Sequence, residues 1–223
     1  MSFRPVIIAP SVLSADFARL GAQAAEAEAA GAGWLHLDVM DGRYVPPITF
    51  GAQVVAALRP RVAVPLDVHL MVVEPERHIA DFAKAGATSL TVHVEAAVHL
   101  HRTLEAIRDL GVRPGVALNP TTPLSAIEEA LPYVDLVNVL SVDPGYGGQR
   151  FIPGTAGKIA RLRAMIDARD LPVLIEVDGG ASPETIATIA AAGADVVVAG
   201  SAVFNPQATV AANFARLQAA ARA

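Results

Sequence analysis

Eight short apolar runs recur along the chain, and each is followed by a longer segment with the apolar periodicity of a helix. This alternation predicts parallel strands joined by helical crossovers, since a tight hairpin cannot connect parallel strands. The 223 residues give about 28 residues per unit, enough for one strand, one helix and short loops. The predicted strands are residues 6–9, 34–39, 66–71, 89–94, 115–118, 136–140, 173–177 and 196–199.

Glycine and proline mark the ends of the predicted helices. Gly31, Gly86, Gly111 and Gly193 directly follow helical segments, where glycine commonly ends a helix. Ser182-Pro183 and Thr122-Pro123 are typical of an N-cap followed by proline at the first helical position. The predicted helices are residues 17–30, 52–58, 76–85, 103–110, 124–131, 157–168, 183–192 and 208–221.

Eight regular units favour a closed α/β barrel, the (β/α)8 or TIM barrel, as a single domain over residues 1–223. An open doubly wound sheet is the structural alternative. That fold typically carries a Gly-x-Gly-x-x-Gly loop after its first strand, whereas Pro10 and Ser11 stand at this place. We therefore expect the closed barrel.

The composition excludes several kinds of protein. The absence of cysteine excludes disulfide frameworks, cysteine nucleophiles and thiolate metal sites. A net charge of -5 and an aromatic content of 5% disfavour an extended nucleic-acid surface. The longest apolar stretch, residues 186–204, is interrupted by Gly193, Asp195 and Gly200, and the apolar run at the start is too short for a signal peptide. We expect a cytoplasmic protein that binds neither nucleic acid nor membranes.

Polar residues gather at the carboxyl ends of the predicted strands, where a barrel of this kind holds its active site. His36 and Asp38 are two residues apart and so share one face of their strand, and His69 and Asp178 end two other strands. A lone inward histidine is more often a hydrogen-bonded core residue. Four such residues together predict one divalent cation, Zn2+, Mn2+, Fe2+ or Co2+. The sequence does not decide whether Asp67 and Glu176 form salt bridges or support a metal ligand through a hydrogen bond.

Glycines follow the last three strands, at residues 145–148, 179–180 and 200. Backbone N–H groups at such glycines can approach an anion closely, and the loops after strands seven and eight commonly hold phosphate in this fold. A tight turn is the alternative for any one pair. Three such loops in succession predict a phosphate site built from backbone amides, which reconciles an acidic chain with an anionic substrate.

The distribution of lysine excludes some chemistry. Lys84 and Lys158 are the only lysines, and neither lies at a strand end, so Schiff-base and pyridoxal-phosphate chemistry is not expected. The absence of an Asp-x-Lys pair also argues against sugar-phosphate decarboxylases that use that motif. Two carboxylates, a cation and a sugar phosphate remain, a set that suits proton abstraction beside a carbonyl with the cation stabilising an enediolate.

Motifs along nearly the whole chain closely resemble those of the ribulose-phosphate 3-epimerase family, in the family's order. They are residues 9–17 (Ala-Pro-Ser-Val-Leu-Ser-Ala-Asp-Phe), 36–42 (His-Leu-Asp-Val-Met-Asp-Gly), 45–46 with 49–51, 67–71 (Asp-Val-His-Leu-Met), His93 with Glu95, 118–120, 144–149 with Phe151, and 177–180. The resemblance implies a ribulose-phosphate-binding barrel that interconverts D-ribulose 5-phosphate and D-xylulose 5-phosphate at C3 through a 2,3-enediolate.

The resemblance also implies a role for each matching residue. His36, Asp38, His69 and Asp178 match metal ligands, and Asp38 and Asp178 match the two acid/base residues. Met40 and Met71 match methionines that line the site. The positions that match substrate and phosphate contacts are Ser11, His69, Gly145, Tyr146, Gly147, Gly148, Asp178, Gly179, Gly180, Gly200 and Ser201. A homo-oligomer, dimer or hexamer, is implied as well.

The chain departs from the family pattern at three positions. Leu140 replaces a third methionine, and Arg43 and Pro47 replace His and Asn in the loop after the second strand. These changes concern the fit over the substrate. The alternatives are therefore the same chemistry on a hexulose 6-phosphate such as allulose 6-phosphate, a lyase or decarboxylase, and a non-catalytic phosphate-binding barrel. Gly148 favours the pentose substrate.

Overall fold

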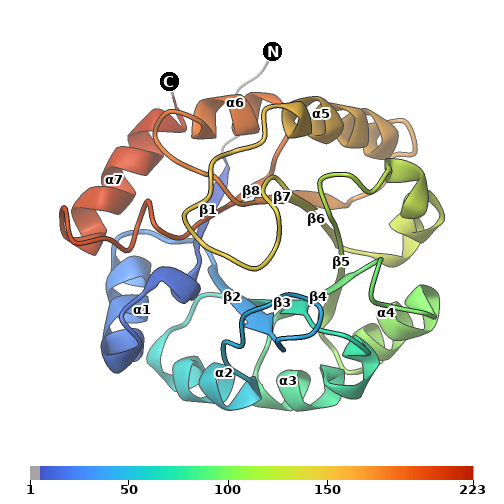
Figure 1. The fold of residues 1–223 in the computed structure, drawn as a ribbon, viewed down its shortest axis with the longest axis horizontal. Coiled ribbons are helices and arrows are strands. Elements are labelled where there is room, and N and C mark those ends of the chain that lie inside the picture. Colours follow the sequence, from blue (N-terminus) through green and yellow to red (C-terminus); the bar gives the residue numbers. More distant parts are fainter. Residues whose placement is uncertain (1–5, 223) are drawn as a thin grey trace.

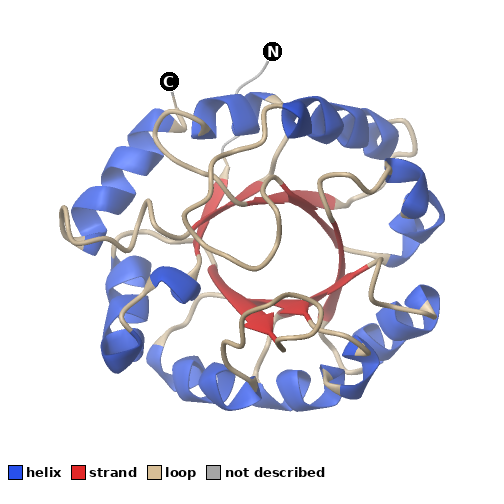
Figure 2. Ribbon diagram, in the orientation of Figure 1, coloured by secondary structure: helices blue, strands red, loops and turns tan. Residues whose placement is uncertain are grey.

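The chain folds as an eight-stranded parallel barrel surrounded by helices (Figures 1 and 2). The structure is a computed structural model and describes residues 6–222. The strands follow one another around the barrel in the order β1-β8-β7-β6-β5-β4-β3-β2. Their bounds are β1 Ile7–Pro10, β2 Leu35–Met40, β3 Leu66–Met71, β4 Ser89–His93, β5 Arg113–Leu118, β6 Leu136–Leu140, β7 Leu174–Asp178 and β8 Val196–Ala199. The predicted (β/α)8 barrel is confirmed.

The barrel closes between its first two strands, at what we call the β1–β2 seam. A parallel bridge joins Ser11 to His36 there, and the N–H of Gly33 donates to the carbonyl of Ile8 over 3.3 Å. The seven other neighbouring pairs form ladders of at least three residue pairs. The seam is thus the least extensively paired part of the sheet, and it lies beside two predicted site residues.

A ring of helices covers the outside of the barrel (Figure 2). The α-helices are α1 Leu20–Ala29, α2 Ala52–Leu58, α3 Ile79–Ala85, α4 Leu100–Asp109, α5 Gly154–Asp167, α6 Ile186–Ala191 and α7 Val210–Ala220. The four glycines predicted to end helices all have positive φ angles, from 74° to 110°, as a left-handed stop requires. Ser182 is not the predicted N-cap, because α6 begins at Ile186 and Thr185 takes the capping position; the Ser182 hydroxyl instead accepts from the N–H of Glu184 over 3.2 Å in the turn before the helix.

The fifth predicted helix is wrong in type. Residues 124–131 were expected to be α-helical, but the structure has two short 3-10 segments, Leu124–Ala126 and Glu128–Tyr133. Pro132 lies inside the second segment, and a proline there can neither donate an α-helical hydrogen bond nor avoid the preceding turn. Thr122 is not an N-cap, because its hydroxyl donates to Glu95 and Pro123 takes the capping position.

Strand alternation separates the apolar layer from the polar interior. On β2, Leu35, Leu37 and Val39 are buried in the main hydrophobic cluster, which packs the strands against the helices. His36 and Asp38 point the other way, into the barrel, as the period of two requires. Among residues 6–222 no helix has both the length and the apolar character of a membrane span.

Candidate active site

Four side chains from three strands converge inside the barrel. His36 and Asp38 come from β2, His69 from β3 and Asp178 from β7. Oδ1 of Asp38 lies 3.2 Å from Nε2 of His36 and 3.2 Å from Nδ1 of His69. Oδ2 of Asp178 lies 3.8 Å and 3.4 Å from the same two nitrogens. The ligand atoms of this predicted quartet all lie within 4.8 Å of one another.

The electrostatics of the quartet are those of two acids facing two protonated imidazoles. Burial lowers the pKa of His69, but its hydrogen bonds to Asp178 and Asp38 outweigh this and raise the pKa to about 9. Burial lowers the pKa of His36, but the neighbouring carboxylates and its hydrogen bonds to Asp38 and Asp67 together raise it well above its usual value. Burial raises the pKa of Asp38, but the charges of His36 and His69 and its hydrogen bonds to both rings together hold it far below its usual value. Without a cation, protons therefore balance the two carboxylates.

The donor set fits a divalent cation. Two imidazole nitrogens and two carboxylate oxygens, with three of the four side chains buried, are the mixed ligands that Zn2+, Mn2+, Fe2+ or Co2+ accept. A cation at this place would take over from the histidine protons as the partner of Asp38 and Asp178. The nature of the cation is left open by these ligands.

His36 is supported from its far side by the two acids that the sequence left open. Its Nδ1 lies 2.6 Å from Oδ2 of Asp67, and Oδ1 of Asp67 accepts from the hydroxyl of Ser89 over 2.5 Å. Oε1 of Glu176 lies 3.4 Å from the same Nδ1. Burial, together with the charge of Asp67, raises the pKa of Glu176 to about 8. Asp67 is thus the ionised acid that holds the His36 ring, and Glu176 is its protonated neighbour.

His69 leads to a histidine that sequence reasoning did not assign to the site. Nε2 of His69 lies 2.9 Å from Nε2 of His93, whose Nδ1 lies 3.2 Å from Oε2 of Glu95. Burial lowers the pKa of His93 to about 4. Burial raises the pKa of Glu95, but its hydrogen bonds, chiefly to His93, bring it down to about 2. The signal was present, because His93 and Glu95 repeat the two-residue spacing of His36 and Asp38.

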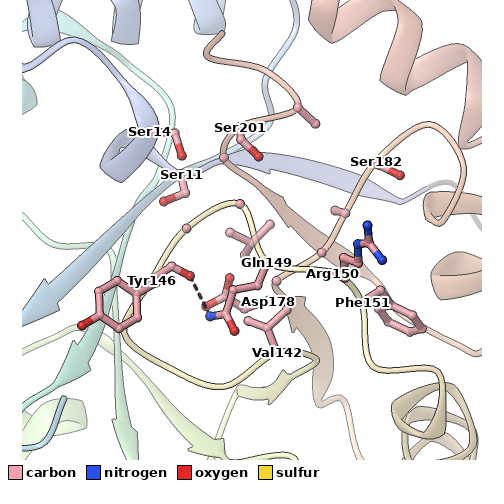
Figure 3. A pocket seen from close by; sticks show the side chains of 18 of the residues that line it. Ser11, Ser14, Val142, Tyr146, Gln149, Arg150, Phe151, Asp178, Ser182 and Ser201 are labelled. Carbon is pink, nitrogen blue, oxygen red and sulfur yellow. Dashed lines mark hydrogen bonds between the residues drawn. The ribbon is translucent and has the colours of Figure 1, made fainter. Parts of the chain in front are cut away.

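A cavity of about 700 Å³ opens above the quartet (Figure 3). Asp38 and Asp178 line its floor, with Met40, Met71 and Leu140 beside them. His69 is fully buried beneath the two acids and is not among the lining residues, although the sequence predicts it as a substrate contact. The cavity thus exposes the two acids and keeps the imidazoles behind them.

The glycine loops form much of the cavity wall. In Figure 1 the segment between β6 and α5 crosses the mouth of the barrel. The amide of Gln149 donates to the carbonyl of Tyr146 over 2.9 Å (Figure 3) and to that of Asp143 over 2.5 Å, which holds the loop in shape. The predicted contacts that line the cavity are Ser11, Gly145, Tyr146, Gly147, Gly148, Asp178, Gly179, Gly180, Gly200 and Ser201.

Gly180 shows why one of these loops needs glycine. Its φ is +66°, and a Cβ there would lie 2.4 Å from the backbone nitrogen of Phe151. The loops after β6 and β7 therefore touch through their backbones. Several polar lining residues were not among the predicted contacts, and Ser14 and Arg216 are two of them. Arg216 lies on α7, far from any strand end, so no strand-based pattern could have found it.

Comparisons with known proteins show the family to which the chain belongs. Residues 7–204 match the family described as the ribulose-phosphate 3 epimerase family. Ribulose-phosphate 3-epimerase of Synechocystis sp. is 55% identical over 202 residues, which cover 90% of this chain and 88% of that protein. Ribulose-phosphate 3-epimerase of Bacillus subtilis is 51% identical over 198 residues, which cover 88% of this chain and 91% of that protein.

Solved structures share the fold at much lower identity. The crystal structure of KGPDC from Streptococcus mutans superposes with a TM-score of 0.72 at 14% sequence identity, and the match covers 97% of each chain. A likeness at this identity concerns the barrel alone. The sequence relatives, and not the structural ones, therefore bear on the chemistry of the cavity.

Proposed function

Because the chain belongs to the ribulose-phosphate 3-epimerase family and is an epimerase of pentose phosphates, we propose that Asp38 and Asp178 carry out its proton transfers. In this proposal D-ribulose 5-phosphate and D-xylulose 5-phosphate interconvert at C3 through a 2,3-enediolate. The observation that carries it is the meeting of Asp38 and Asp178 on one cavity floor, from strands that β1 and β8 separate. Inversion at carbon needs two such groups, one for each face.

One aspartate takes the proton from C3, and the electron pair of that C–H bond passes into the enediolate. The other aspartate, in its protonated form, gives a proton to C3 from the opposite face, and the C2 carbonyl re-forms. Asp38 is available as a proton acceptor because Ser11 and the imidazoles favour its ionised form. The same contacts make it a weak base, so stabilisation of the charge on the substrate oxygens has to acidify the C3 proton.

The quartet supplies the ligands for a divalent cation, namely Nε2 of His36, Nδ1 of His69, Oδ1 of Asp38 and Oδ2 of Asp178. When bound, such a cation supplies Lewis-acid stabilisation for the negative charge that develops on the substrate oxygens. Zn2+, Mn2+, Fe2+ and Co2+ all suit this mixed donor set. The imidazoles are buried and do not line the cavity, so in this proposal they hold the cation and do not contact the substrate.

The phosphate is proposed to lie among the glycine loops. Residues 145–148, 179–180 and 200–201 line the same cavity as the two acids, and the backbone amides of such loops can bind phosphate without a basic patch. Ser11 stands where a hydroxyl could contact either the substrate or Asp38. The six-carbon alternative has no observation in its favour.

Proton exchange with solvent tests the proposal most directly. Ribulose 5-phosphate is incubated with the protein in D2O, as purified, after chelation, and after each of the four cations is added back. We expect xylulose 5-phosphate, deuterium at C3 and loss of both on chelation. Epimerisation without deuterium at C3 would contradict the two-acid scheme, and full activity after verified metal removal would contradict the metal centre.

The predicted homo-oligomer and cytoplasmic location stay predictions. Sedimentation velocity of the purified chain tests the first, with a dimer or hexamer expected. Fractionation of the source cells tests the second. Neither result affects the roles proposed for Asp38 and Asp178, because both residues line a cavity that is formed within a single chain.

A further inference from the structure

The ring of His69 connects the proposed metal centre to two side chains that the proposed function does not use. Its Nε2 lies 2.9 Å from Nε2 of His93, and the two rings stack with centroids 5.0 Å apart. Nδ1 of His93 lies 3.2 Å from Oε2 of Glu95. The three side chains form one hydrogen-bonded row from the buried centre to the partly exposed Glu95.

Glu95 sets the direction of the hydrogen bonds in this row. Its Oε1 accepts from the backbone N–H of Asn119 over 2.9 Å and from the hydroxyl of Thr122. Its Oε2 faces His93. An ionised carboxylate can only accept hydrogen bonds, so Nδ1 of His93 must carry the proton. Nε2 of a neutral His93 is then left as an acceptor.

His69 must therefore carry a proton on its Nε2, because two imidazole nitrogens 2.9 Å apart share one hydrogen. In neutral His69 this leaves the lone pair on Nδ1, the atom that lies 3.2 Å from Asp38 and 3.4 Å from Asp178. A cation needs that lone pair. We propose that Glu95 and His93 are positioning residues that fix the tautomer and orientation of His69 for metal binding; this inference rests on the metal centre of the proposed function.

The other proposed histidine ligand, His36, is held in the same way but by a direct hydrogen bond to a carboxylate. His36 offers Nε2 to the centre, and its Nδ1 meets Asp67 directly at 2.6 Å. His69 offers Nδ1, and its outer nitrogen reaches a carboxylate only through His93. Each ligand histidine is thus connected by hydrogen bonds to one carboxylate outside the centre, directly or through His93, as metal-binding histidines commonly are. The ring of Tyr44, 4.7 Å from that of His93, packs the intervening imidazole in place.

Glu95→Gln keeps the size and shape of the side chain but reverses the direction of the hydrogen bonds that run from residue 95 through His93 to His69. The amide oxygen of the glutamine satisfies the N–H of Asn119, so its NH2 group faces His93 and requires an acceptor at Nδ1. His93 then carries its proton on Nε2 and opposes the Nε2–H of His69. We expect the affinity for Zn2+, measured by competition with a chelator, to fall by about 10–100-fold. Glu129→Gln, which removes the same charge at an exposed position, should bind Zn2+ as the unchanged protein does.

Two variants of His93 test whether Zn2+ affinity depends on its hydrogen bonds, and not on its charge or on the space that its ring fills. His93→Gln can accept from His69 with its oxygen and donate to Glu95 with its nitrogen, so most of the Zn2+ affinity should be kept. His93→Phe fills the space but leaves His69 without a partner, so its affinity should fall as far as that of Glu95→Gln. Circular dichroism and thermal unfolding of each variant check that the barrel is formed.

The tautomers themselves are read from 15N NMR of histidine side chains in the Zn2+-loaded protein. We expect His93 protonated on Nδ1 and His69 on Nε2. A His93 protonated on Nε2, or a folded Glu95→Gln variant with unchanged Zn2+ affinity, would overturn the proposal while leaving the proposed function intact. A native protein that binds no cation would overturn the metal centre and this inference together, whereas deuterium exchange at C3 reports on the two acids separately.

Discussion

The hydroxyl of Ser11 donates to Oδ2 of Asp38 over 2.5 Å, inside the barrel and at its closing seam. Because Oδ2 is engaged in this way, the other oxygen of Asp38 is the one that faces the two histidines. One serine thus joins the first strand to a proposed acid/base residue. Its hydroxyl supports the ionised form of that acid.

Ser11→Ala should weaken catalysis without unfolding the chain. The substitution removes one hydrogen bond to a charged group, worth about 1.5–3 kcal/mol, that holds the orientation of the Asp38 carboxylate, so we expect kcat/KM to fall by about 10–100-fold. Steady-state kinetics measure the loss, and thermal unfolding measures the stability. Unchanged kinetics in a folded Ser11→Ala variant would contradict a role for this hydroxyl.

Asp38→Asn and Asp178→Asn should each retain the fold and lose proton transfer. An amide neither accepts a proton from carbon nor returns one, so we expect kcat to fall by about 10²–10⁴-fold or more. Asp109→Asn, a change of the same kind at an exposed residue of α4 outside the cavity, is the matched control. Near-normal turnover by either site variant would refute the two-acid scheme.

Cation binding should release protons and tighten as the pH rises. The pKa of His69 lies at about 9 in the metal-free protein, and that of His36 is also raised, so both rings are protonated at neutral pH. A cation needs them neutral. The apparent Kd should fall about tenfold per pH unit for each proton released, until the pH passes the pKa of His69. Calorimetry in buffers of different ionisation enthalpy counts the protons; none released near neutrality would contradict this assignment.

Gly180→Ala should damage both stability and substrate binding. The left-handed backbone costs alanine about 1–3 kcal/mol, and its Cβ would overlap the backbone of Phe151. We expect a lower midpoint in urea and a raised KM. Gly154→Ala, at the start of α5 where a Cβ meets nothing within 4 Å, should be neutral or stabilising. Equal stability of Gly180→Ala and the native protein would show that the loop adapts.

The sequence predicts the fold well because the strand pattern is unusually clear. Each strand alternates between side chains in the helix-packed layer and side chains inside the barrel, so the inward direction of His36 and Asp38 follows from counting by two. The error at residues 124–131 has a local cause. Apolar periodicity does not separate an α-helix from 3-10 turns, and Pro132 decides between them.

The site is predicted less completely than the fold. Strand ends identify the acids and the glycine loops, but hydrogen bonds between strands depend on the register of one strand against another. Asp67 lies level with His36 across the β2–β3 ladder, which single-strand spacing cannot reveal. The partnership of His69 with His93 likewise needs the β3–β4 pair. Arg216 reaches the cavity from a helix surface that no local motif marks.

The β1–β2 seam couples assembly of the site to completion of the barrel. The ligands of the quartet come from β2 and β3 on one side of the seam, and from β7 on the other side, beyond β1 and β8. An unclosed sheet would hold these ligands apart. A cation bound to all four ligands would therefore stabilise the closed barrel. A chain whose barrel had not closed could neither bind the metal at this site nor present both acids to the substrate.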